Sequence, residues 1–214
     1  TLEQLNGAAS IVDRLELDDA QISSTLELHR AFPELYMAHS AAFLFPIITI
    51  RGVTSAQDFY NPALTVYVDG VPQLPIVAAQ SLLGVQQVEL LKGPQGTLYG
   101  KSAQGGVLNI VSHKPDGTPQ FVARAGVSSR DGYQLQAEGA GPLIQDLLYG
   151  SVSLLANDVN GDVRSDVIGS EELGGVRSRA GNVKLRLAPT GSPWELGLSA
   201  GRDCATGDQD VYTL

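Results

Sequence analysis

The sequence predicts two kinds of structure in tandem, a small α+β domain over residues 1–117 and antiparallel β-strands over residues 118–214. Up to residue 117, short β-branched and aromatic runs mix with helical spacing and turn signals, without a regular βαβ repeat. From residue 118 onward, apolar and polar residues alternate with the period of a β-strand, in segments of about ten residues. The 24 glycines favour turns and tightly packed β structure in both parts.

The composition argues against several classes of protein. The 214 residues carry 14 Lys and Arg against 23 Asp and Glu, a net charge of −9 without a basic cluster, so nucleic acid is not expected as a partner. A hydrophobic content of 43% is too high for a disordered chain. One Cys cannot form an internal disulfide, and three His argue against a zinc site. No apolar run reaches the length of about 18 residues that a transmembrane helix needs.

In the α+β part, we expect a short strand within Ala9–Leu17 and then a helix over Ala20–Phe32. Asp18 and Asp19 provide the helix N-cap, and Pro33 ends the helix. A turn signal, Asp69-Gly70, closes one of the later strands. The remaining expected elements are strands at Ile47–Arg51, Leu64–Val68, Val85–Leu91 and Gly106–Ser112 and a weak helix at Ala78–Leu83.

In the second part, alternation predicts about five strands, around Phe121–Val127, Tyr133–Glu138, Leu148–Leu155, Asn182–Leu187 and Trp194–Gly201. A soluble sandwich would alternate in the same way. Short turns on one side, a long polar connection at Asn157–Ala180, and Tyr149 and Trp194 at strand starts favour an outer-membrane barrel, although the turn at Ser129–Gly132 is shorter than this rule predicts. Because the smallest closed barrel needs about eight strands, we expect the chain to be the N-terminal part of a larger protein.

Three segments, in this order and spacing, strongly resemble the plug domain of TonB-dependent outer-membrane receptors. They are Ile50-Arg51-Gly52, VYVDGVP at Val66–Pro72, and VELLKGPQGTLYGKSAQGGVLNIV at Val88–Val111. Further segments resemble the ferric yersiniabactin (pesticin) receptor branch: Arg51–Gln73, Gly100–Gly106, Leu148–Leu155 and Gly181–Pro189. The resemblance implies an α+β plug domain with a small mixed sheet over residues 1–117, followed over residues 118–214 by the first strands of a 22-stranded transmembrane β-barrel.

The resemblance also implies a function: energy-coupled import of a ferric siderophore across the cell outer membrane. The siderophore would be cargo rather than cofactor, and the partners would be the TonB energy-transducing protein and outer-membrane lipid. The TonB box of this family precedes the plug, and we find none in Thr1–Ser10. Two alternatives remain: an importer of haem, vitamin B12 or a sugar on the same architecture, or a soluble plug-like binding module. Cell fractionation would distinguish the soluble module from a receptor.

By resemblance, the ligand touches the outward loops Ala38–Phe45, Thr54–Asn61 and Pro72–Ile76. These loops offer nine candidate ligand-binding residues: His39, Ser40, Phe43, Gln57, Asp58, Phe59, Tyr60, Gln73 and Leu74. Aromatic rings with a few polar groups suit an amphipathic chelator, although Phe59 and Tyr60 could instead anchor their loop. No carboxylate, imidazole or thiolate cluster is apparent, so we expect the plug not to ligate iron directly.

Four charged residues lie in an otherwise apolar, Gly-rich region: Arg51, Glu89, Lys92 and Lys101. Charges buried at a plug–barrel wall must be paired, so we interpret them as a structural lock. The family usually carries Arg where this chain has Lys92, and Lys lacks the bidentate fork of Arg. Gly96–Ser102 falls one residue short of a P-loop, so nucleotide binding is not expected. No nucleophile motif adjoins a histidine, and we do not expect an enzyme.

Cys204 follows the fifth predicted strand, where topology implies an extracellular loop that begins near Asp203. An exported protein enters an oxidising compartment, in which a single Cys suggests a partner elsewhere. We therefore expect a disulfide partner beyond Leu214. The alternative is a free, buried Cys that behaves as a small apolar residue.

Overall fold

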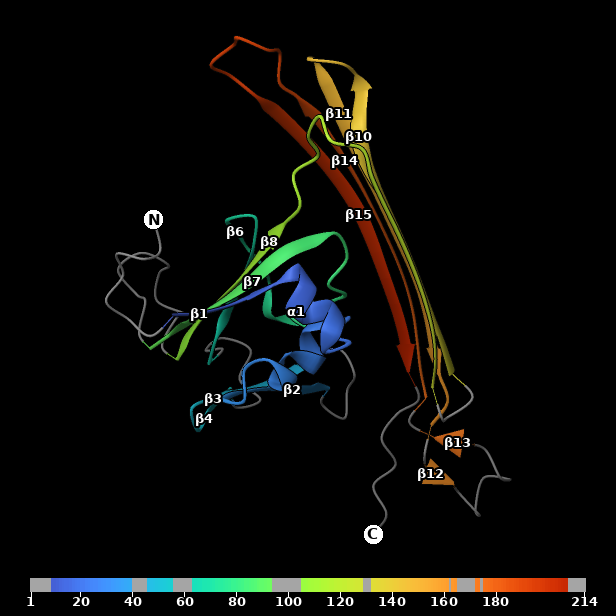
Figure 1. The fold of residues 1–214 in the computed structure, drawn as a ribbon. Coiled ribbons are helices and arrows are strands. Elements are labelled where there is room, and N and C mark those ends of the chain that lie inside the picture. The colour runs from blue at the N-terminus through green and yellow to red at the C-terminus, as the bar shows by residue number, and fades with distance from the viewer. Residues whose placement is uncertain are drawn as a thin grey trace. The chain divides into compact units, whose positions relative to one another are not determined.

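The computed structural model describes residues 9–39, 46–55, 63–93, 105–128, 132–161, 163–164, 172–173 and 175–207. The chain divides into two compact units, Thr1–His113 and Lys114–Leu214, and each unit has its own sheets (Figure 1). Among the described residues, no helix is long and apolar enough to cross a membrane.

The first unit is built on a five-stranded mixed sheet of order β1-β7-β8-β5-β6. Its strands are β1 (Ala9–Asp13), β7 (Val85–Lys92), β8 (Gly106–Ser112), β5 (Thr65–Val68) and β6 (Val71–Pro72). Strand β5 runs parallel to β8, whereas the other neighbours are antiparallel. A second, antiparallel sheet contains β2 (Leu35–His39), β3 (Pro46–Ile50) and β4 (Val53–Thr54). The expected mixed sheet is therefore confirmed.

The helices differ from the sequence prediction. Helix α1 (Arg14–Asp19) begins earlier than expected, because Asp13 and Glu16 form a capping box at its start. The helix ends before Gln21, whose φ is 53°. The expected helix over Ala20–Phe32 is wrong: this stretch contains only the 3₁₀ helix η2 (Thr25–Arg30).

The second expected helix, Ala78–Leu83, is also wrong. The 3₁₀ helix η3 (Pro75–Val77) precedes it, and Ser81 instead forms an isolated β-bridge with Ser24. Next to this bridge, the buried Thr25 hydroxyl donates to the Ala78 carbonyl at 2.8 Å and accepts from the Gln80 amide at 3.0 Å. Backbone groups that a helix would have paired internally are thus satisfied across the two segments.

The hydrophobic core of the first unit lies between its sheets and short helices. Its largest fully buried side chains include Leu28, Phe32 and Leu35, together with Ile50 of β3 and Leu90 of β7. Alternate residues of β7 and β8 supply the rest, since Val88, Leu108 and Ile110 join the same cluster. The short apolar runs of the sequence therefore become strands with one face in a common core.

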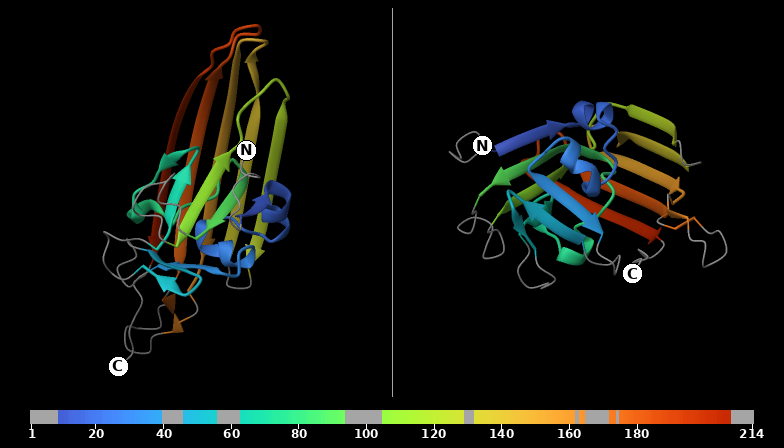
Figure 2. Two further views of the ribbon diagram at one scale, coloured as in Figure 1. Left: turned by 90° about the vertical axis from the view of Figure 1, so that its left-hand side faces the viewer. Right: turned by 90° about the horizontal axis from the view of Figure 1, so that it is seen from below.

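The second unit is a five-stranded antiparallel sheet of order β9-β10-β11-β14-β15, whose long strands lie side by side (Figure 2). Its strands are β9 (Gln120–Ser128), β10 (Gly132–Ile144), β11 (Leu148–Val159), β14 (Val176–Leu187) and β15 (Leu196–Gly207). A small pair, β12 (Val163–Arg164) and β13 (Glu172–Leu173), lies between β11 and β14 in the sequence. Strand β15 contains Cys204, which is exposed, so the expected loop near Asp203 is wrong.

The strand register sorts the side chains of the second unit into two faces. Ala137, Leu154 and Gly181 form one cross-strand row, and Glu138, Ser153 and Asn182 form the next. Because neighbouring rows point to opposite sides, the sheet has an apolar and a polar face. The apolar face carries Phe121, Ala123, Ala125, Leu135, Ala137, Val152, Leu154, Val183, Leu185, Leu198 and Ala200. The polar face carries Gln120, Arg124, Gln136, Glu138, Ser151, Ser153, Asn182, Lys184 and Ser199.

Candidate functional site

An ion pair joins the two sheets of the first unit. Lys92, the last residue of β7, places its Nζ atom 2.6 Å from Oε1 of Glu34, which directly precedes β2. The Lys92 ammonium holds the pKa of the Glu34 carboxyl below its ordinary value, with a smaller contribution from the charge of Arg51. Both paired side chains are about three-quarters buried, with 22% and 25% of their surface exposed. The Glu34 carboxylate is thus the centre of a small charge cluster.

Arg51 reaches this cluster through a tight turn between β3 and β4. Arg51 and Gly52 have φ values of 49° and 80°, and positive φ at both positions is what a type I′ hairpin turn requires. The Arg51 amide donates to the Glu34 carbonyl at 3.0 Å, which fixes the turn beside Glu34. Positive φ is uncommon for Arg, so tertiary contacts and not local preference hold this backbone.

Two adjacent glycines pack the same end of the unit. A Cβ atom on Gly105 would lie 2.5 Å from the carbonyl oxygen of Ala63 and 2.5 Å from Cγ2 of Ile50. A Cβ atom on Gly106 would lie 2.5 Å from the carbonyl oxygen of Leu91. The chain at Ala63 and at Leu91 lies too close to the two glycines for any side chain to fit there, which explains why this motif contains glycine.

Glu89 has a different environment from the other predicted lock residues. It lies three residues before Lys92 in β7, so the two side chains point to opposite faces of the strand. The Glu89 carboxylate is buried and accepts from the side-chain amides of Gln87, at 2.5 Å, and Asn109, at 2.8 Å. Of the four predicted lock residues, Lys92 therefore pairs with Glu34, Arg51 lies in the turn beside Glu34, Glu89 is satisfied by amides, and Lys101 lies outside the described residues.

Most of the predicted ligand-binding residues lie outside the described part of the chain. His39 ends β2, with its backbone opposite Pro46 of β3. The stretch between these two residues contains Ser40 and Phe43, which are not described. The other residues outside the description are Gln57, Asp58, Phe59 and Tyr60, which fall between Ser55 and Ala63. Their proposed contact with a ligand stays a prediction.

The third predicted ligand loop is described. The Gln73 amide donates to the Val66 carbonyl at 2.8 Å, and its side chain donates to the Val71 carbonyl at 3.0 Å, so this residue braces its own loop. Leu74 is 67% exposed and Val71 is 60% exposed. The loop therefore presents an apolar surface on a rigid backbone, as contact with an amphipathic ligand requires.

The turn of the β5–β6 hairpin is held by Ser112, a residue that the sequence prediction did not single out. Asp69, with φ 50°, and Gly70 form the turn between β5 and β6. The Asp69 carboxylate accepts from the Ser112 amide at 2.8 Å and from the Ser112 hydroxyl. The turn signal Asp-Gly was visible in the sequence, but the contact with Ser112, which ends β8, depends on the parallel pairing of β5 with β8.

A charged cluster of the second unit ties the segment before β9 to the turn before β15. Glu195 accepts from Nε of Arg186 at 2.9 Å and from Nζ of Lys114 at 3.3 Å. These two cations hold the pKa of the Glu195 carboxyl below its ordinary value. The Arg186 guanidinium also lies over the ring of Tyr149, 5.7 Å from its centroid. The segment at Lys114 is therefore fastened to the sheet that follows it.

The described residues contain no group of three or more His, Cys, Asp and Glu side chains that could hold a metal ion. The clusters in both units instead consist of charges and amides that satisfy one another. Such an arrangement stabilises loops and fixes surfaces.

The chain is similar in sequence to known proteins. Residues 1–107 match the family model of the TonB-dependent Receptor Plug Domain. The pesticin receptor of Yersinia pestis is 52% identical over 207 residues, which are 97% of this chain and 31% of that receptor. The chain thus spans about a third of the length of these curated relatives.

The chain also matches solved structures. The crystal structure of the ferric yersiniabactin uptake receptor FyuA from Yersinia pestis matches with a TM-score of 0.93 at 52% identity, over 98% of this chain and 33% of that one. The pyoverdine outer membrane receptor FpvA from Pseudomonas aeruginosa PAO1, bound to pyoverdine, matches with a TM-score of 0.74 at 17% identity, over 95% of this chain and 28% of that one. The second match is a likeness of fold.

Proposed function

Because the chain belongs to the TonB-dependent receptor plug domain family, we propose that the protein of which it is part binds a ferric siderophore and imports it across the outer membrane. The observation that carries this proposal is the match to the ferric yersiniabactin uptake receptor, at 52% identity over 98% of this chain. Identity at this level over both units favours a similar ligand as well as a similar fold. The proposed ligand is therefore a ferric chelate of the yersiniabactin type.

In this proposal, residues 1–117 are the plug and residues 118–214 are the first strands of the barrel. The compact mixed sheet of the first unit is suited to filling a wide lumen. The long antiparallel strands of the second unit, with one apolar and one polar face, are suited to a wall between lipid and lumen. Closure of that wall would remove the unpaired strand edges that lipid does not tolerate.

The proposed cycle assigns separate tasks to the regions of the plug. The siderophore is captured at the outer face by the three loops, with contacts from His39, Ser40, Phe43, Gln57, Asp58, Phe59, Tyr60, Gln73 and Leu74. The TonB protein then pulls on a segment before the plug, and the plug rearranges so that the cargo enters the periplasm. No step of this cycle needs chemistry on the ligand, so the proposed protein is a transporter and not an enzyme.

In this proposal, the charged residues determine how strongly the plug resists the pull of the TonB protein. Lys92 holds Glu34 inside the plug with a smaller contribution from the charge of Arg51, and the Lys92–Glu34 contact connects β7 with the start of β2. We place Glu89 and Lys101 at the plug–barrel wall, in the lock that the sequence predicted. The amide partners of Glu89 keep its carboxylate satisfied without a cation, so its contact with the wall can break without leaving an unpaired buried charge.

Ligand binding by the purified full-length receptor tests the proposal. The variants Phe59→Ala and Tyr60→Ala should weaken binding of ferric yersiniabactin, with folding intact. Tyr36→Ala is a matched control, since this exposed aromatic residue of β2 lies outside the three loops. Unchanged affinity in variants of all three loops would remove the proposed site. Tight binding of vitamin B12 or haem, with none of the ferric chelate, would favour another importer of the same architecture.

A further inference from the structure

Three arginines lie together on the apolar face of the second sheet. In the register of β14 and β15, Arg177 is opposite Thr206, Arg179 is opposite Cys204, and Arg202 is opposite Gly181. These positions share the face of Leu185 and Leu198, and all three arginines are exposed. A charged cluster on an otherwise apolar face is unusual, because a lipid-exposed cation is costly within the apolar band of a barrel.

The charge of this cluster is only partly compensated. Nε of Arg177 lies 2.7 Å from Oδ2 of Asp158, its register partner on β11. Arg202 donates from Nε to Sγ of Cys204 at 3.2 Å. Within the described part of the chain, neither Arg179 nor Arg202 has a carboxylate within ion-pair distance. Two positive charges therefore face outward from a chain whose net charge is −9.

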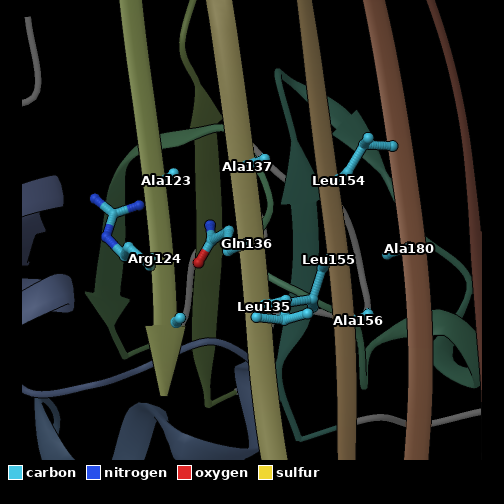
Figure 3. Close-up of a pocket in the computed structure, with 10 residues that line it drawn as sticks. Ala123, Arg124, Leu135, Gln136, Ala137, Leu154, Leu155, Ala156 and Ala180 are labelled. Carbon is cyan, nitrogen blue, oxygen red and sulfur yellow. The ribbon is translucent and has the colours of Figure 1, made fainter.

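An apolar hollow adjoins the arginines. It has a volume of about 480 Å³ and is lined by residues of four neighbouring strands, β9, β10, β11 and β14 (Figure 3). Six of its ten lining residues share the face of Arg179, and these are Ala123, Ala125, Leu135, Ala137, Leu154 and Ala156. Ala156 is the register partner of Arg179, so the hollow reaches the cluster. Five of the ten lining residues are alanines, and Leu135 and Leu154 are exposed large apolar side chains among the others.

The height of Arg179 matches the edge of a lipid layer. Leu187 ends β14 at the side of the short turn, and Arg179 lies eight residues before it. At about 3.3 Å per residue and a tilt of about 40°, this spacing corresponds to a height of about 20 Å. The apolar band of an outer-membrane barrel is about 25 Å tall. Arg179 therefore lies near the far edge of such a band, and the hollow lies on its inner side.

We infer that this surface binds a lipid with a phosphorylated head group, with the phosphate on Arg179 and Arg202 and an acyl chain in the adjoining hollow. The inference rests on the proposed outer-membrane function, because only a lipid-facing wall would meet such a ligand. The guanidinium fork pairs with phosphate oxygens through two parallel hydrogen bonds, which is the geometry that favours arginine over lysine. The positions of the arginines and the hollow also match such a lipid, since its head group would lie at the edge of the apolar band and its acyl chain would point toward the middle of that band.

The site is tested on the full-length receptor in detergent, by native mass spectrometry during titration with dioleoyl phosphatidylglycerol. Dioleoyl phosphatidylcholine has the same chains without the net negative charge. We expect the receptor to bind the anionic lipid at least about tenfold more tightly, and Arg179→Gln to remove most of that preference. Lys184→Gln is the matched control, because it removes one positive charge from the same strand on the polar face. The control should keep the preference.

A second variant tests the hollow. Ala137→Leu fills it with an apolar side chain that a lipid-facing surface tolerates. We expect this variant to weaken phosphatidylglycerol binding several-fold and to leave binding of glycerol 3-phosphate, the head group without chains, at the level of the unmodified receptor. Equal binding of the two lipids, or equal effects of Arg179→Gln and Lys184→Gln, would overturn the inference. A receptor that imports ferric siderophore but shows no lipid preference would refute this site alone and leave the proposed function standing.

Discussion

Gly105→Ala should strongly destabilise the first unit, because the packed backbone around Gly105 leaves no room for a methyl group. The new Cβ would lie 2.5 Å from the Ala63 carbonyl oxygen and 2.5 Å from Cγ2 of Ile50, and real Cβ atoms essentially never approach closer than 3.0 Å. The chain must therefore move by at least 0.5 Å, the difference between 3.0 and 2.5 Å. Ile50 is fully buried and cannot swing aside.

The backbone movement also endangers a hydrogen bond. The Gly105 amide donates to the same Ala63 carbonyl at 2.9 Å, so relief of the clash lengthens that bond. Overpacking costs about 1–3 kcal/mol and a lost hydrogen bond about 1 kcal/mol, so we expect a loss of about 3 kcal/mol in the free energy of unfolding. With a urea dependence of about 1.5 kcal/mol per molar, the unfolding midpoint should fall by about 2 M.

Two other glycines provide matched controls. Gly93 has φ 89° and open space around its Cβ position, so Gly93→Ala tests backbone strain alone and should cost about 1 kcal/mol. Gly126 has open space and no positive φ, so Gly126→Ala should change little. Pulse proteolysis of the full-length receptor in increasing urea, with cleavage followed in the first unit, measures all three. A midpoint for Gly105→Ala within about 0.3 M of that for Gly126→Ala, or about 0.5 kcal/mol at that urea dependence, would refute the close packing around Gly105.

Two further predictions concern named polar groups. Lys92→Gln should lower the free energy of unfolding by about 1 kcal/mol at neutral pH. Because the pKa of Glu34 is lowered in the folded state, the ion pair stabilises the plug above the ordinary carboxyl pKa and loses that contribution as the pH falls through the folded-state pKa. An equal loss at pH 3 and pH 7 in pulse proteolysis would contradict the pairing. Ser112→Ala should cost about 1 kcal/mol in the same assay, through the hydrogen bond to Asp69, whereas Ser112→Thr should keep most of it.

The strands were predictable because their signals are local. Val85–Leu91 is a short apolar run that begins after Gly84, Gly106–Ser112 is rich in β-branched residues, and β7 and β8 occupy these segments almost residue for residue. The helix over Ala20–Phe32 was mispredicted because its apolar spacing outweighed a capping box that lies earlier, at Asp13 and Glu16. Tertiary hydrogen bonds of Thr25 then favoured a 3₁₀ turn over a regular helix.

The charge cluster was predictable only in part. Arg51 and Lys92 stood out because charges are rare in a Gly-rich, apolar region, and Lys92 is paired with Glu34 inside the first unit, while the plug–barrel lock stays a prediction. Its partner, Glu34, carries no signal of its own, because it lies in a short turn far away in the sequence. Only the packing of β2 and β3 on the main sheet brings it to the end of β7. Local sequence patterns do not reveal residues whose role depends on such a long-range contact.

Uptake of radiolabelled ferric yersiniabactin tests the proposed import most directly. The full-length gene that contains this chain would be expressed in Gram-negative cells that lack their own receptor for this chelate, with and without a functional TonB protein. We predict that label accumulates in the periplasm only when both the receptor and TonB are present, and that Phe59→Ala or Tyr60→Ala lowers accumulation at limiting chelate. Absence of uptake by a folded, surface-exposed receptor, or uptake that is equal without TonB, would contradict the proposed import.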